Sequence, residues 1–169
     1  CENYPAGPGQ WGVLKVGCVN GGQFNSEENK ALPADLAPVP ALSLRCGDVL
    51  VSRANTRDLV GSVAVVEQDF DHLLLCDKLY RLRVKRSEFD PTFLALFLGS
   101  PLARGVIESA ATGASSSMLN ISQAAIVEMR ITQPPISEQT EIVERLRVES
   151  SRFDELIAEA KRAGSLLRE

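Results

Sequence analysis

The sequence predicts an α+β fold: a compact domain built on a twisted, largely antiparallel sheet, followed by a single long α-helix of the coiled-coil type. Short runs with the two-residue period of strands fill the first half of the 169-residue chain. Two helix-start signals follow them. Prolines 134 and 135 then separate this mixed part from a proline-free segment with a helical period. We therefore expect a domain over residues 1–134 and a long helix over residues 135–169.

Six runs rich in apolar and β-branched residues predict the strands. They cover residues 13–19, 47–53, 60–67, 73–76, 78–84 and 128–132. The turn Asn20-Gly21-Gly22 ends the first run, and a polar loop at 54–58 separates the second from the third. Residues 24–43 contain three prolines and predict a long surface excursion.

Asp90-Pro91 and Ser100-Pro101 each combine a capping side chain with a proline that suits the first turn of a helix. They predict helices that end near Leu98 and Ala111. Residues 112–117 are small and polar and predict a flexible connector, after which Ser122 begins a short helix.

In the last segment, apolar residues recur at alternating steps of four and three, and Glu149 occupies the one position that breaks the series. This spacing is that of a coiled-coil seam, so we expect a helix interface with a second copy of the helix. The expected interface residues are Ile142, Leu146, Phe153, Leu156, Ala160, Ala163 and Leu167. The alternative is a helix packed on its own domain. A segment on the order of 45 Å long, at ~1.5 Å per residue, exceeds what one small domain covers.

The charge balance limits how the chain could bind nucleic acid. It has 18 basic and 22 acidic residues, a net charge of −4, whereas most nucleic-acid binders are basic. Between residues 45 and 86 the balance reverses, with 8 basic and 6 acidic residues. A DNA-binding face would therefore depend on a few well-placed side chains rather than on bulk charge.

Three polar segments are candidates for contacting DNA, because such side chains hold phosphates and read base edges. The candidate DNA-binding residues are Arg53, Asn55, Thr56, Arg57, Lys78, Arg81, Arg83, Thr112, Gly113, Ser115 and Ser116. In the first segment, arginine matches guanine and asparagine matches adenine. Each segment also has a structural interpretation, as a solvated turn, a solvated strand face or a connector. Further plausible contacts are Asn20, Gln23, Asn25 and Lys30, although for these residues we favour a role in shaping their own loop.

No catalytic or metal site is predicted. The four cysteines are widely spaced, without a C-x-x-C pair, and His72 is the only histidine. We expect reduced, mostly buried thiols and a cytoplasmic protein. Phosphate-loop and dinucleotide motifs are absent, so no cofactor is expected. No apolar run reaches the ~18 residues of a membrane span, and no membrane partner is expected.

Several motifs resemble the specificity subunits of Type I restriction–modification systems, in the order in which that family has them. GDVLVSR at 47–53, followed by Val60-Gly61, is similar to their strand–loop–strand. PTFL at 91–94 and SPLAR at 100–104 resemble their helical pair, and TG at 112–113 with LNIS at 119–122 resembles the next segment. The most specific match is ITQPPISEQTEIV at 131–143, which resembles their junction into a conserved helix.

The resemblance implies a target recognition domain that reads one half of a split DNA site, followed by a conserved helix. Family members usually contain two such units, whose helices pair antiparallel as a spacer. The implied partners are double-stranded DNA, methyltransferase subunits that modify adenine, and an endonuclease subunit in the full complex. The chain itself would not be an enzyme. Since it has one unit and an abrupt start, we expect a half-subunit or a fragment.

Two other functions compete with this one. The acidic balance and the strong seam favour a helix-mediated scaffold without DNA affinity, which the polar loop at 53–57 does not explain. Asp48 and Glu67 could form the acidic pair of a small metal nuclease, but no lysine follows Glu67 two residues later.

Overall fold

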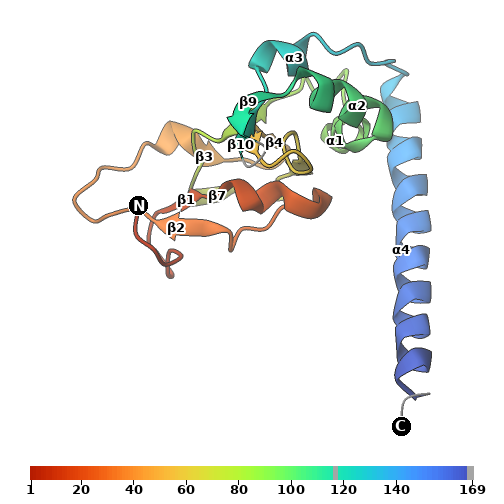
Figure 1. Cartoon of the computed structure of the whole chain (residues 1–169), viewed down its shortest axis with the longest axis horizontal. Coiled ribbons are helices and arrows are strands. Elements are labelled where there is room, and N and C mark those ends of the chain that lie inside the picture. The colour runs from red at the N-terminus through yellow and green to blue at the C-terminus, as the bar shows by residue number, and fades with distance from the viewer. Residues whose placement is uncertain (116–117, 167–169) are drawn as a thin grey trace.

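The computed structural model describes residues 1–115 and 118–166. Figure 1 shows a body of small sheets that is covered by short helices. The long helix α4 (Ile136–Leu166) extends from this body. The predicted α+β class is confirmed. The strands, however, form three small sheets instead of one.

The outer sheet has four strands in the order β2-β1-β7-β3. β1 (Gly12–Leu14) pairs antiparallel with β2 (Asn29–Ala31) and parallel with β7 (Phe70–Leu74), and β3 (Ser43–Leu44) pairs antiparallel with β7. Two 3-10 helices, η1 (Val16–Gly22) and η2 (Pro40–Leu42), lie in its connections. The predicted excursion at 24–43 is therefore partly regular structure.

The central sheet, β6-β4-β8, separates two hydrophobic cores. β4 (Val49–Ser52) pairs antiparallel with β6 (Val63–Val65) and with β8 (Leu79–Leu82). Since successive side chains on a strand point to opposite faces, β4 contributes Leu50 to the first core and Val49 and Val51 to the second. Both faces are covered, which explains why the GDVLVSR strand carries so little polar alternation.

Helices α1 (Pro91–Gly99) and α2 (Pro101–Ala110) start where the sequence predicts. The Asp90 carboxylate accepts hydrogen bonds from the backbone N–H groups of Thr92 (2.7 Å) and Phe93 (3.0 Å). The Ser100 hydroxyl accepts one from the N–H of Ala103 (3.3 Å). These caps satisfy donors that the first turn of a helix leaves unpaired.

The third sheet has the order β5-β10-β9 and packs beside the second core. It consists of β5 (Ala54–Asn55), β10 (Met118–Asn120) and β9 (Thr112–Ser115). The short helix α3 (Gln123–Val127) follows, with the predicted cap at Ser122, whose hydroxyl accepts from the N–H of Ala125 (3.1 Å).

Three predicted segments have a different structure. In 13–19 only β1 is a strand, because Cys18 and Val19 are both fully buried, and neighbouring residues cannot share the covered face of a half-exposed strand. The predicted connector at 112–117 begins as strand β9. Residues 128–132 form no strand. Instead, the N–H groups of Glu128 and Met129 close the last turn of α3 by bonding Ala124 and Ile126 carbonyls.

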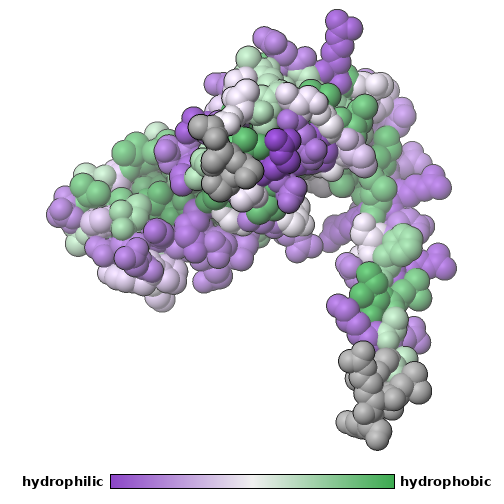
Figure 2. All heavy atoms as spheres, in the orientation of Figure 1, coloured by the Kyte–Doolittle hydropathy of each residue, from purple (hydrophilic) through white to green (hydrophobic). Residues whose placement is uncertain are grey.

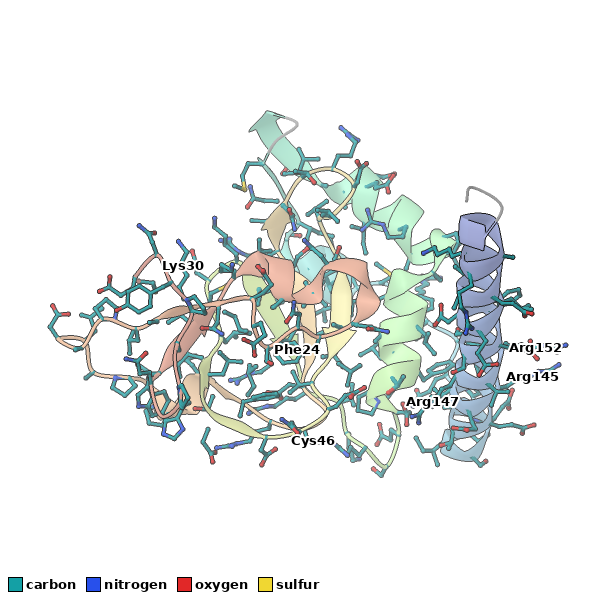
Figure 3. All side chains as sticks on the ribbon, turned by 90° about the horizontal axis from the view of Figure 1, so that it is seen from below. Phe24, Lys30, Cys46, Arg145, Arg147 and Arg152 are labelled. Carbon is teal, nitrogen blue, oxygen red and sulfur yellow. The ribbon has the colours of Figure 1, made fainter. Side chains whose placement is uncertain are left out.

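Gln139 ties the long helix to the domain. Its side chain is fully buried, and its Oε1 accepts a hydrogen bond from the N–H of Asp90 (2.9 Å). Its Nε2 donates to the carbonyls of Glu88 (2.9 Å) and Pro134 (2.8 Å). In Figure 3, α1 lies beside α4.

Across the described parts of the chain, no single helix has the length and apolar character needed to cross a membrane. Only α1 and α2 taken together, as a bent pair, reach that length and composition.

Candidate nucleic-acid interface

The third sheet brings together two segments that the sequence suggests separately. β10 lies between them, with Leu119 opposite Asn55 on one side and Asn120 opposite Thr112 on the other. The N–H of Ile121 also donates to the carbonyl of Arg53 (2.9 Å). The turn at 53–57 and the start of the 112–117 segment are therefore neighbours, although about sixty residues separate them in the chain.

Gly113 is required by this pairing. A Cβ on Gly113 would lie 2.4 Å from the carbonyl oxygen of Met118 on the neighbouring strand, closer than real Cβ atoms approach. Strand pairing therefore explains why glycine stands at position 113, independently of the predicted approach to a phosphate. The side chain of Ser115 and all of Ser116 lie outside what the structure describes.

Lys78 lies next to the 53–57 turn. The N–H of Arg53 donates to the carbonyl of Lys78 (2.8 Å), and the Arg53 guanidinium donates from Nε to the carbonyl of Asp77 (2.9 Å). Thr56, Arg57 and Lys78 are exposed. We use the name polar edge for these neighbouring residues, of which Arg53 and Asn55 are half-buried and the others are exposed: Arg53, Asn55, Thr56, Arg57, Lys78, Thr112 and Gly113.

Arg81 and Arg83 are not part of this edge. Arg83 donates from Nε to the buried carboxylate of Asp48 (2.7 Å), which raises the pKa of the guanidinium. Arg81 donates to the carbonyls of Ser43 (3.0 Å) and Ala41 (3.1 Å) and lies 3.7 Å from the Asp48 carboxylate. Both arginines hold the structure around Asp48, so we leave them out of the candidate interface.

One residue joins the polar edge from a distant segment. The Nδ2 of Asn55 donates to the Oδ1 of Asn20 (3.4 Å), at the kink of η1. The sequence marks Asn20-Gly21-Gly22 as a turn, but no local pattern connects that turn with residue 55.

The predicted seam on α4 is mostly exposed. Ile142 is half-buried next to the domain, while Leu146, Phe153 and Leu156 are 45%, 62% and 53% exposed. Ala160 and Ala163 are also exposed, and Leu167 lies outside the described residues. Ile157, which the series omits, is 51% exposed and falls on the same helix face. Figure 2 shows apolar residues, in green, along the part of α4 that extends from the body.

The histidine and the cysteines noted in the sequence make no metal site among the described residues. His72 packs edge-on against Trp11, with the ring centroids 4.8 Å apart. Burial raises the pKa of the Cys18 thiol to about 12. Within residues 1–115 and 118–166, no group of three or more histidine, cysteine or acidic side chains could hold a metal ion.

A hollow of about 790 Å³ lies between η1, β6 and α1. Its lining includes Phe24, Val65 and Leu96 and contains no residue of the polar edge. It therefore does not coincide with the candidate interface.

The chain is similar in sequence to proteins of known class. No protein-family model matches it. The specificity subunit of the Type I restriction enzyme EcoEI of Escherichia coli is 30% identical over 133 residues, which are 79% of this chain and 22% of that protein. The EcoKI specificity subunit of Escherichia coli K12 is 27% identical over 136 residues, which are 79% of this chain and 29% of that protein.

Solved structures share the fold. The HsdS subunit from Thermoanaerobacter tengcongensis superposes with a TM-score of 0.70 at 24% identity, over 93% of this chain and 40% of that one. A chain from a study of complex assembly in the type I R-M system gives 0.69 at 21% identity, over the same shares. The chain spans about a quarter of the length of the curated relatives it matches. In sequence the chain is similar to one part of the Type I restriction-enzyme specificity subunits, and in fold it matches solved structures of that system.

Proposed function

We propose that this chain reads one half of a split DNA site on behalf of a methyltransferase. Residues 1–134 would be the target recognition domain and residues 135–169 the spacer helix. The observation that carries the proposal is the polar edge: two segments suggested independently as DNA contacts, together with Lys78, meet on one small sheet. Recognition side chains are commonly held this way, on loops fixed by a rigid scaffold.

The chemistry of the polar edge suits DNA. Arg57 and Lys78 are exposed cations that can neutralise phosphates, and Thr56 and Thr112 are exposed hydroxyls that can donate to them. Arginine and asparagine side chains read base edges in the major groove. With a net charge of −4, the chain would bind through these few groups, and its affinity would fall with salt by a log–log slope of about −0.9 for each phosphate neutralised.

The long helix supplies spacing. α4 has 31 residues, which at ~1.5 Å per residue is about 46 Å. Its apolar stripe would pair with the same helix of a second unit. The resemblance to the specificity subunits implies an antiparallel pairing of the two helices. In Figure 3, Arg145 and Arg152 extend from α4 away from the body.

Catalysis would belong to the partners. The described residues hold no metal-binding group, and the buried carboxylate of Asp48 is taken up by arginines, so it is poorly placed to act as a nuclease ligand. Methyltransferase subunits, and an endonuclease subunit in the full complex, would act on the DNA that this chain selects. The free thiols fit a reducing compartment, and we place the protein in the cytoplasm.

A reconstitution experiment tests this function. The chain is mixed with mixed-sequence duplex DNA and S-adenosylmethionine, and then with Mg²⁺, each time with and without the cognate methyltransferase subunit. We expect adenine methylation at a split site only when the partner is present. Methylation or cleavage by the chain alone would contradict the proposal. A chain that assembles through α4 but never binds DNA would instead be a scaffold.

A further inference from the structure

We propose that Asn20 and Asn55 act as one coupled unit that reads a guanine, rather than the adenine that an isolated asparagine matches. This inference rests on the proposed DNA-reading function and names the base that this part of the polar edge takes. It depends on how the two side-chain amides are bonded.

The hydrogen bonds identify the atoms of both amides. The backbone N–H of Thr56 can only donate, so the side-chain atom of Asn55 that lies 2.9 Å from it is the acceptor Oδ1. The Nδ2 of Asn55 then donates to Asn20, whose bonded atom must be its own Oδ1 (3.4 Å). Both carbonyl oxygens already hold a hydrogen bond within the protein. One N–H of Asn55 and both N–H groups of Asn20 have no acceptor among the described residues.

Backbone structure holds both asparagines in place. Asn20 (φ −69°, ψ 137°) and Gly21 (φ 81°, ψ 7°) have the angles of the two central residues of a type II turn, in which the second position requires glycine. The fully buried residues Cys18 and Val19 anchor this turn directly before Asn20. On the other side, Asn55 is paired with Leu119 in the third sheet.

The turn is also accessible. Asn20, Gly21 and Gly22 are exposed, and a Cβ added to either glycine would meet nothing within 4 Å. A duplex could therefore approach the pair without displacing protein atoms. Preorganised amides lose little conformational entropy on binding, which favours discrimination between bases.

The remaining N–H groups favour guanine. In the major groove guanine presents two acceptors, N7 and O6, whereas adenine presents the acceptor N7 and the donor N6. A lone asparagine matches adenine with its oxygen and nitrogen together. In the Asn20–Asn55 pair each oxygen already accepts one hydrogen bond, while three N–H groups remain without an acceptor among the described residues. The pair can therefore present two donors together, which match the two acceptors of guanine, whereas the N6 donor of adenine has no matching group among them. A good base contact of this kind is worth roughly 5- to 150-fold in affinity.

Selection from a library of duplexes with randomised positions tests the pair, using the full chain. We expect the wild type to enrich a guanine position that the variant Asn20→Asp loses, with the other selected positions unchanged. This variant keeps an acceptor for the Nδ2 of Asn55 but has no N–H of its own. Asn20→Ala, Asn55→Ala and the double variant should lose the same preference to a similar extent, because the two residues act as one unit.

Asn3→Ala is the matched control, since Asn3 is an exposed asparagine at the N-terminal end of the body, and its selected sequences should not change. Thermal melting should be equal for the wild type, Asn20→Asp and Asn3→Ala. A wild type that selects specific sequences, and Asn20 variants that select the same ones, would refute the pair and leave the proposed function standing. Loss of an adenine preference in Asn20→Asp would refute the donor argument. A wild type without any sequence preference would overturn the proposed function and the pair together.

Discussion

Replacing Gln139 tests how the long helix is held on the domain. Gln139→Ala removes three side-chain hydrogen bonds, to the N–H of Asp90 and the carbonyls of Glu88 and Pro134. Each neutral hydrogen bond contributes a net ~0.5–1.5 kcal/mol, so the free energy of unfolding should fall by about 1.5–4.5 kcal/mol. The side chain is fully buried, which means that the abandoned backbone groups gain little solvation in return.

The assay is urea unfolding with two probes. Trp11 is the only tryptophan and lies in the outer sheet region, so its fluorescence follows the domain, while far-UV circular dichroism is dominated by α4. We expect both midpoints to fall in Gln139→Ala. Gln139→Glu should lose at least as much, because its second oxygen would face two carbonyls.

Gln133→Ala is the control for these variants. Gln133 also donates to the carbonyl of Glu88 (3.3 Å), but it is exposed, and its loss should cost less than about 0.5 kcal/mol. If Gln139→Ala is as stable as Gln133→Ala, the buried amide does not hold the helix and the reasoning is wrong.

Three further predictions follow from the surfaces and the thiols. Arg57→Ala should weaken binding to the selected DNA site and leave the melting temperature unchanged, because the Arg57 side chain is exposed and makes no hydrogen bond or ion pair with the described residues. Equal methylation of the site in the variant and the wild type would remove this turn from the interface. Leu156→Glu should convert the α4-paired oligomer to monomer in analytical ultracentrifugation, because it places a charge in the apolar stripe. Ser151→Glu adds the same charge on the opposite face of the helix and should leave the oligomer intact. A wild type that is monomeric at high concentration would contradict the seam. At pH 8 the exposed Cys46 should react rapidly with a thiol reagent, whereas Cys18 should react only after unfolding. The Cys18 thiol is buried and, with a pKa of about 12, stays protonated at this pH. Rapid labelling of Cys18 in the native protein would contradict its burial.

The caps and the helical period could be predicted from the sequence because they are local. Asp90-Pro91 and Ser100-Pro101 mark the starts of α1 and α2, since a capping oxygen and a proline act within one helical turn. The apolar steps along 142–167 predict α4 for the same reason: its surface pattern depends on residues three and four apart. The family resemblance also rests on contiguous motifs.

Tertiary structure decided which polar residues share a face. Residues 53–57, 78 and 112–113 meet because β10 pairs with both β5 and β9, and strand pairing between distant segments leaves no local trace in the sequence. The same limit explains Arg81 and Arg83, which read as a basic strand face but converge on Asp48, more than thirty residues earlier. It also explains Asn20, which a turn motif identifies but only the folded chain brings to Asn55. Periodicity determines which side of an element is apolar, whereas partners far apart in the chain determine what each polar side chain is left free to bind.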